Sequence, residues 1–157
     1  MPNRQQGFSL IEVLVTMIIM AIGLMGLAAM QMVSTKNVNN SQSRTVASYL
    51  AYDMAERMRS NPEGLDGGHY NSIDGTEGAP TKNCQTLMTE CSASELAASD
   101  AYHWNQTVQS NIINGGLGAG STGTVSVAAG IYTIGIDWQE QDRNANGDTT
   151  LSIQLIP

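Results

Sequence analysis

A long stretch without charge near the amino terminus constrains this chain more than any other feature. From Val13 to Val33 there is no charged side chain. As a helix rising about 1.5 Å per residue, this stretch is about 31 Å long, enough to cross the hydrocarbon core of a bilayer. The sequence therefore predicts a membrane-spanning helix. Arg4 and the amino terminus are a thin positive-inside signal that places the leading end in the cytoplasm.

One acid, Glu12, directly precedes this uncharged stretch. A charged side chain at mid-membrane costs about 2.5–3.5 kcal/mol, so an acid in a membrane span calls for a partner, and the helix offers none nearby. Cleavage between Gly7 and Phe8 would create an ammonium group at the helix start. In packed copies, Glu12 of one chain can then pair with the Phe8 amine of another, which removes the penalty only on assembly.

Two other interpretations of this segment stay open. It resembles a secretory signal peptide in that Gly26 and Ala28 are small residues before a cleavage point, and the mature chain would then start at Ala29. The length of the apolar stretch and the position of Glu12 weigh against this. A plain membrane anchor is the second alternative, and it leaves the cost of Glu12 unexplained.

The stretch GFSLIEVLV, residues 7–15, resembles the processing site of type IV pilins and of the related pseudopilins of type II secretion. It has Gly7 before the cut, Phe8 as the residue to be N-methylated, and Glu12 four positions further on. The stretch SYLAYDMAERMRSNP, residues 48–62, extends the resemblance to the minor pilin family PilV, the type IV pilus modification proteins.

The resemblance implies a subunit that prepilin peptidase cleaves and methylates, held in the inner membrane with its head in the periplasm. It is then built in low copy into an extracellular pilus through an inner-membrane assembly platform, beside major and other minor pilins, and supports adhesion and twitching motility. Major pilins commonly carry a proline in the outer half of the span. This chain has Gly23, Gly26 and Ala29 there, which favours a minor subunit. A pseudopilin of type II secretion shares the same amino terminus and stays an alternative.

The second half of the long helix is predicted to be amphipathic. Its apolar residues recur at helical spacing and call for a partner surface: Ala47, Leu50, Ala51, Met54 and Met58. Three charged residues lie largely off this stripe: Asp53, Arg57 and Arg59. They form either a solvated face with spaced ion pairs or a subunit contact. Before it, residues 34–43 are rich in polar side chains of low helix propensity, so we expect a bend or local melting there. The helix should end near Asn61, because Pro62 follows.

The remainder predicts a small head, and the fold class is α+β with the pilin architecture. Glycines and prolines make residues 62–92 a loop. Ser92 and Glu95 form a capping-box pattern that opens a helix over residues 93–113. Alternating apolar residues then predict three antiparallel strands, at about 123–129, 131–138 and 149–156. The predicted parts are thus a leader (1–7), a membrane and assembly half of the helix (8–33), an amphipathic half (34–61) and a head (62–157).

The two cysteines, Cys84 and Cys91, lie in the loop of the predicted head. If this region lies outside the cytoplasm, a disulfide that closes a short loop is the expected state. The alternative is a metal site with His69 and His103, which lacks the paired spacing of known metal motifs.

The segment from Asp142 to Ile153 matches part of a calcium loop, with Asp142, Asn144, Asn146 and Asp148 as candidate ligands. Its last position is Ile153 where a bidentate Glu is required, and a turn rich in Asn and Gly explains the same residues. No cofactor is therefore expected, with calcium kept as a weak alternative.

Other function classes are disfavoured. The glycine-rich residues 115–123 follow a helix and open a strand, which is the reverse of a dinucleotide loop. No catalytic motif stands out, so we do not expect an enzyme. The net charge of −7 argues against nucleic acid as a partner.

Overall fold

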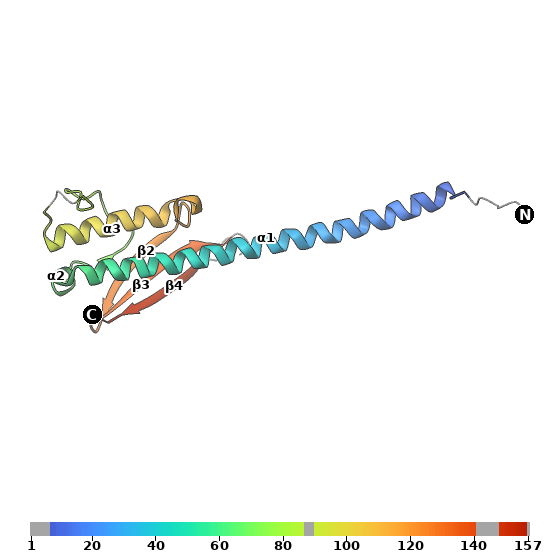
Figure 1. Cartoon of the computed structure of the whole chain (residues 1–157). Coiled ribbons are helices and arrows are strands. Elements are labelled where there is room, and N and C mark those ends of the chain that lie inside the picture. Colours follow the sequence, from blue (N-terminus) through green and yellow to red (C-terminus); the bar gives the residue numbers. More distant parts are fainter. Residues whose placement is uncertain (1–6, 87–89, 141–147, 157) are drawn as a thin grey trace, which may run out of the picture. The chain divides into compact units, whose positions relative to one another are not determined.

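The computed structural model describes residues 7–86, 90–140 and 148–156. The chain divides into two units, Met1–Asn39 and Asn40–Pro157, which we call the stem and the head. Helix α1, Leu10–Ser60, contributes to both (Figure 1). The expected local melting at residues 34–43 is not seen, because every residue of this stretch is α-helical. The end of α1 directly before Asn61 confirms the prediction made from Pro62.

In the stem, the side chains of α1 are exposed throughout the apolar stretch. Its large apolar residues, from Leu10 to Val33, lie between 42% and 83% exposed. Of the helices that the structure describes, α1 is the one long and apolar enough to cross a membrane. Because no described residue of the stem covers this surface, lipid or another helix would supply its apolar surroundings.

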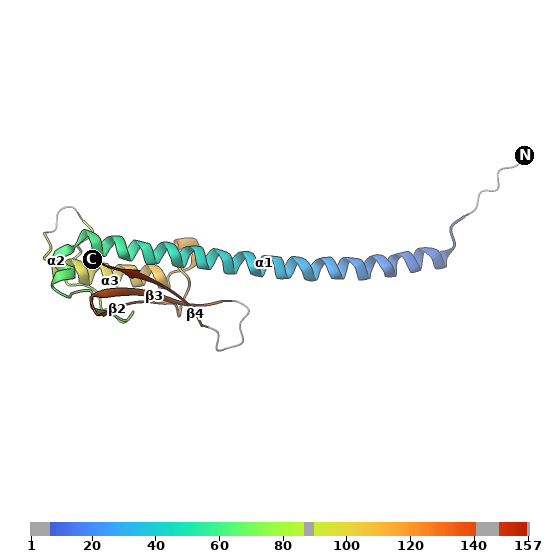
Figure 2. The ribbon, with the colours of Figure 1, turned by 90° about the horizontal axis from the view of Figure 1, so that it is seen from below.

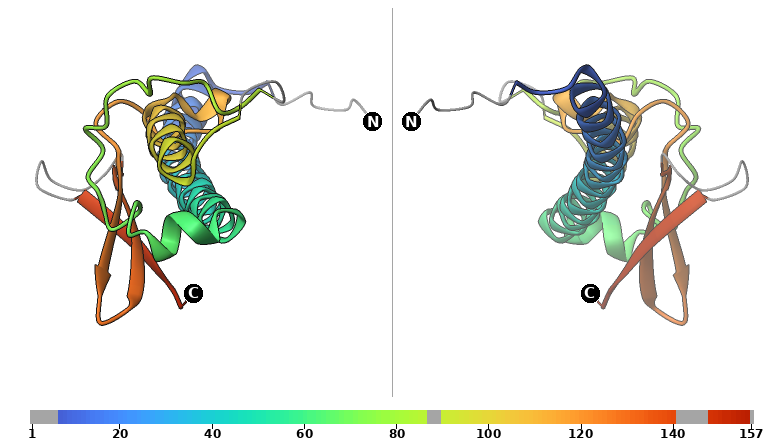
Figure 3. Two further views of the ribbon diagram at one scale, coloured as in Figure 1. Left: turned by 90° about the vertical axis from the view of Figure 1, so that its left-hand side faces the viewer. Right: turned by 90° about the vertical axis from the view of Figure 1, so that its right-hand side faces the viewer.

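The head has two layers. The later part of α1 and helix α3, Ala93–Gln109, lie on one face of an antiparallel sheet, as the end-on views show (Figure 3). Figure 2 shows β3 and β4 running lengthwise beside this part of α1. The predicted apolar stripe of α1 is confirmed as its buried face: Ala47, Leu50, Ala51, Met54 and Met58. Ala55, which was not predicted, is buried with them.

The sheet has the order β1-β2-β3-β4, with every neighbouring pair antiparallel. Strands β2 (Thr122–Ala128), β3 (Ile131–Gln139) and β4 (Asp148–Leu155) correspond to the three predicted strands. The turn between β2 and β3 is Ala129–Gly130, with φ of 52° and 79°. Two successive positive φ values are those of a type I′ turn, which suits the twist of a two-residue hairpin. The alternating apolar residues of β3 are buried: Tyr132, Ile134, Ile136 and Trp138.

The predicted loop over residues 62–92 was wrong in part, because it contains two short elements. Helix α2, Pro62–Asp66, starts at the proline that follows α1, and the side chain of Asn61 accepts a hydrogen bond from the Gly64 amide at 3.1 Å. A proline is favoured in the first turn of a helix, where its missing N–H costs nothing. Strand β1, Ser72–Ile73, pairs with β2 and adds a fourth strand.

The predicted helix over residues 93–113 is shorter than expected. Helix α3 ends at Gln109, since Ser110 has extended backbone with ψ of 162°. A separate 3₁₀ turn, η1, follows at Ile112–Asn114. The apolar periodicity continues through Ile112, but the amide of Leu117 donates to the carbonyl of Val108 at 2.9 Å and closes the end of the helix.

Candidate functional site

The first candidate site is the start of α1. Gly7, Phe8 and Ser9 precede the helix, and the Ser9 carbonyl accepts the amides of Glu12 at 3.0 Å and Val13 at 3.3 Å. Phe8 is 83% exposed. A Cβ added at Gly7 would meet no atom within 4 Å, so the fold itself does not require glycine there. A requirement for glycine at position 7 would therefore come from another molecule.

Glu12 lies in the first turn of α1 and is exposed. In the part of the chain that the structure describes, its carboxylate forms no ion pair and no side-chain hydrogen bond. The amino-terminal end of a helix favours a negative charge, but this effect is worth only about 0.3–1 kcal/mol. That is less than the cost of an acid within a membrane, so a carboxylate placed there calls for a partner from another molecule.

A second cluster joins the end of α1 to α3 and to the segment after α2. The Nε of Arg57 donates to Asp53 at 2.9 Å, and its Nη1 donates to Asp100 at 3.3 Å. The hydroxyl of Tyr70 donates to the other oxygen of Asp100 at 2.8 Å, and it accepts the Asn61 side-chain amide at 3.1 Å. The cluster thus fastens three segments together around a carboxylate.

Burial is the largest influence on the pKa values of Asp100, Tyr70 and Arg57 in this cluster. It raises the pKa of Asp100, because desolvation outweighs the hydrogen bonds from Tyr70 and Arg57. It also raises the pKa of Tyr70, with the nearby Asp100 carboxylate acting in the same direction. For Arg57, burial is opposed and outweighed by Asp53 and Asp100, so its pKa is raised and it stays charged.

The structure corrects the prediction for the polar side of α1. Spaced ion pairs on a solvated face were expected. Asp53 and Arg57, four residues apart, do form an ion pair, but both side chains are half-buried rather than solvated. Arg59 pairs with Glu56 at the surface, as the solvated interpretation had it. The role of Asp100 was missed. Its position in sequence offered a signal, since it falls within the apolar stripe of α3, next to Ala101.

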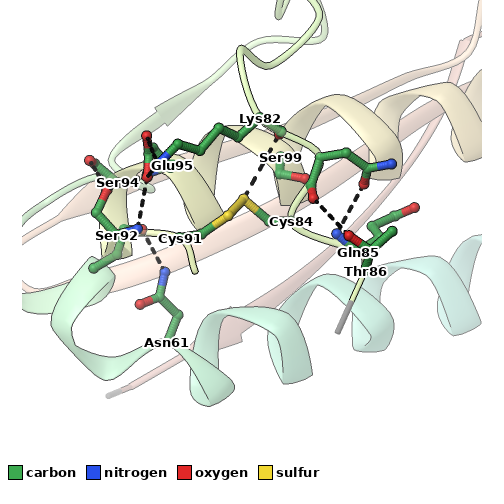
Figure 4. Close-up of a disulfide and its surroundings, with 12 residues drawn as sticks. Asn61, Lys82, Cys84, Gln85, Thr86, Cys91, Ser92, Ser94, Glu95 and Ser99 are labelled. Atoms are coloured by element: carbon green, nitrogen blue, oxygen red, sulfur yellow. Dashed lines mark hydrogen bonds and ion pairs between the residues drawn. A yellow bond between two sulfur atoms is a disulfide. The ribbon is translucent and has the colours of Figure 1, made fainter. Parts of the chain in front are cut away.

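A disulfide joins Cys84 and Cys91, as predicted, directly before the first turn of α3 (Figure 4). Ser92 caps the helix and forms the predicted capping box with Glu95. Lys82 precedes Cys84 in the sequence, and its Nζ lies 2.9 Å from the carboxylate of Glu95, which follows Cys91. The disulfide therefore holds a loop against a helix terminus that several hydrogen bonds already define.

Replacing both cysteines with serine should lower the free energy of unfolding of the head by about 2–3 kcal/mol, because the closed loop is short and restricts the unfolded chain only modestly. Urea denaturation of the full-length chain in detergent, followed by tryptophan fluorescence, measures this change. Reduction of the unaltered chain with a thiol should reproduce it. An unchanged midpoint in both cases would show that the disulfide does not stabilise the head.

The metal alternatives receive no support. The cysteines are oxidised and so provide no thiolate ligands, while His69 is exposed and His103 bonds within its own helix to Ser99. Over the described residues, no group of three or more His, Cys, Asp or Glu side chains could hold a metal ion. Of the calcium candidates, Asp142, Asn144 and Asn146 lie outside the described residues, and Asp148 is described only as the first residue of β4.

Two family models match the chain, and together they cover the whole of α1. A family model described as the prokaryotic N-terminal methylation motif matches residues 2–28. A second, described as type IV pilin Tt1218, matches residues 29–102. No curated protein and no solved structure matches the chain.

These matches agree with the geometry. The methylation motif covers Gly7, Phe8 and Glu12, where the fold imposes no requirement of its own, and the pilin match runs from the apolar helix through most of α3. The long apolar helix, the further helix and the antiparallel sheet are those of an α+β pilin fold. The chain is a type IV pilin-like protein with an N-terminal methylation motif.

Proposed function

We propose that the chain is a minor pilin of a type IV pilus, related to the PilV family. In this proposal it is held in the inner membrane with its head in the periplasm, and it enters the filament in low copy to start or modify it. The observation that supports this is the start of α1. There Gly7 has open space, Phe8 is exposed, and Glu12 has no partner among the described residues, directly before an exposed apolar helix. Gly23, Gly26 and Ala29, in place of a proline, favour the minor role.

The mechanism is assembly rather than catalysis. Prepilin peptidase cleaves after Gly7 and methylates the new amine of Phe8. The apolar half of α1 stores the subunit in the membrane, and entry into the filament exchanges lipid contacts for helix contacts. Such an exchange is close to neutral for apolar side chains, so it does not by itself select one arrangement of the helices.

Glu12 selects one arrangement of the helices in the filament. Its carboxylate has no partner in the described part of its own chain. The Phe8 ammonium of a neighbouring subunit provides one, but only at the stagger that brings the two charges together. Every other stagger leaves an unpaired charge in an apolar environment, which is strongly unfavourable.

The partners in this proposal are the major pilin, other minor pilins and the inner-membrane assembly platform. The head is presented along or at the end of the filament and supports adhesion and twitching motility. The hydrophobic core of the head is formed by residues of α1, α3 and the sheet of the same chain.

Replacing Glu12 with glutamine should leave cleavage intact while it reduces the amount of the chain in purified pili by about tenfold or more, since the charge pair is lost. Immunoblots of sheared pili measure incorporation, and sequencing of the mature amino terminus measures cleavage. The matched control is Glu63→Gln, which removes a carboxylate from the exposed surface of α2.

Normal incorporation of the Glu12→Gln variant would refute the pairing mechanism. A mature chain that begins at Ala29, rather than at N-methyl-Phe8, would refute the pilin assignment and support a secreted domain. Deletion of the chain that leaves pili intact but stops protein secretion would assign it to the type II pseudopilins instead.

A further inference from the structure

Two tyrosines stand exposed on the side of α1 that faces away from the head core. Tyr49 is 68% exposed and Tyr52 is 61% exposed. In contrast, Tyr70 and Tyr132 are buried, and their hydroxyls donate hydrogen bonds within the head. Folding of the head therefore gives Tyr49 and Tyr52 neither burial nor, within the described residues, a hydrogen-bond partner.

These tyrosines belong to a regular stripe, which we call the outer face: Thr45, Tyr49, Tyr52, Glu56 and Arg59. Each of its residues is exposed. The spacing alternates between four and three residues, which is the spacing that lets two helices pack along a common seam. Tyrosine is among the residues that contribute most to protein interfaces when a partner buries it.

The charge distribution of the head indicates what kind of partner fits. Within the described head, each arginine and lysine is already paired with a carboxylate of the same chain: Arg44 with Glu140, Arg57 with Asp53 and Asp100, Arg59 with Glu56, and Lys82 with Glu95. The exposed acids that are left over, such as Glu63 and Asp66, make parts of the head surface acidic. Two copies that met there would repel each other.

The outer face carries no such excess of acid, because its one acid and one base pair with each other. A second copy of the chain therefore meets no like-charge repulsion there. The apolar span on the same helix adds a constraint on geometry. Two copies anchored in one bilayer have their helices parallel and at the same depth, so Tyr49 of one lies level with Tyr49 of the other.

We propose that the outer face of α1 binds the same face of a second copy while both are anchored in the membrane, forming a parallel, two-fold symmetric dimer. The inference rests on the proposed function only in that the chain is stored in a membrane before it enters a filament. A two-fold axis along the helices brings identical residues together, so the Tyr49 rings and the Tyr52 rings stack in successive layers. The dimer is a storage form that precedes filament entry.

Cysteine cross-linking in vesicles of phosphatidylcholine tests the proposal with the purified full-length chain. The probe is Thr45→Cys, which places a thiol on the outer face and keeps both tyrosines. The control is Ser152→Cys, an exposed position on β4. Cys84 and Cys91 are joined to each other and do not compete. On oxidation, the outer-face thiol should give a disulfide-linked dimer, and the control thiol should not.

Adding Tyr49→Ser and Tyr52→Ser to the probe variant should lower the cross-linked fraction about tenfold, since two layers of aromatic contact are lost. Tryptophan fluorescence checks that the head stays folded. Equal cross-linking at both thiols, or cross-linking that the serine substitutions leave unchanged, would overturn the proposal. So would the absence of any dimer in vesicles that contain this chain alone, which is the result expected if the outer face binds a different pilin.

The assay contains no other pilus protein, so its outcome is independent of filament incorporation. A dimer that forms although Glu12→Gln enters pili normally would leave this inference standing and refute the pairing mechanism. Loss of the Glu12→Gln variant from pili, together with no dimer in vesicles, would leave the pairing mechanism standing and refute this inference.

Discussion

Replacing Trp104 with alanine should lower the free energy of unfolding of the head by about 4 kcal/mol, which makes it the most damaging single change that we expect. Trp104 is 0% exposed, and its Nε1 donates to the Leu50 carbonyl of α1 at 2.8 Å. Its ring also packs on the backbone of β2. A Cβ added at Gly123 would lie 2.4 Å from the ring carbon Cζ3. One side chain thus touches both layers of the head, and its loss leaves a large cavity between them.

Urea denaturation of the full-length chain in detergent measures this effect, with the remaining tryptophan, Trp138 in β3, as the fluorescent probe. The matched control is Tyr102→Ala, which truncates a partly exposed aromatic on the same helix and should cost about 1 kcal/mol or less. If the two substitutions destabilised the head equally, Trp104 would not be the centre of the core.

Replacing Arg57 with methionine should lower the free energy of unfolding by about 2 kcal/mol at pH 7, because the Asp100 carboxylate then stays buried without its cation. The Arg57 side chain is 29% exposed and that of Asp100 is 12% exposed, so water screens the pair only in part. Arg59→Met is the control on the same helix turn. Its ion pair with Glu56 is exposed, and its loss should be close to neutral.

The effect of Arg57→Met should depend on pH in a defined direction. Burial already raises the pKa of Asp100 in the folded chain. A carboxyl of this kind stabilises the fold fully below its unfolded pKa, about 3.9, and that contribution is lost as pH rises through the folded pKa. Removal of Arg57 raises the folded pKa further and enlarges the loss. The difference between the variant and the unaltered chain should therefore be largest at neutral pH and shrink toward pH 4. A difference that grew with acid would contradict this account.

The elements with a strong local pattern were predictable from sequence. The stripe from Ala47 to Met58 repeats at helical spacing, and the Ser92–Glu95 capping box needs only residues three apart. The alternation in β3 and the disulfide between two nearby cysteines also depend on short separations. Two elements that the structure contains, β1 and α2, were not predicted from the sequence. A two-residue strand such as β1 has too few residues to show a period, and it forms because β2 is there to pair with it.

The candidate functional residues also differ in whether a local sequence pattern could reveal them. Gly7, Phe8 and Glu12 were identified from sequence because the N-terminal methylation motif to which they belong is a fixed local spacing of residues. Asp100 could not be given its role in this way. Its partners Arg57 and Tyr70 lie 43 and 30 residues away in the chain, and only packing brings them to it.

The amino-acid sequence alone thus determined the membrane helix, its processing motif and the α+β class, because each follows from interactions between residues close together in the chain. Only the tertiary structure decided which polar residues of α1 face the head and which are left for a partner. Arg57 and Tyr52 both lie off the apolar stripe, but Arg57 is held by Asp100 while Tyr52 is 61% exposed. That difference depends on where α3 lies against α1, which no local spacing encodes.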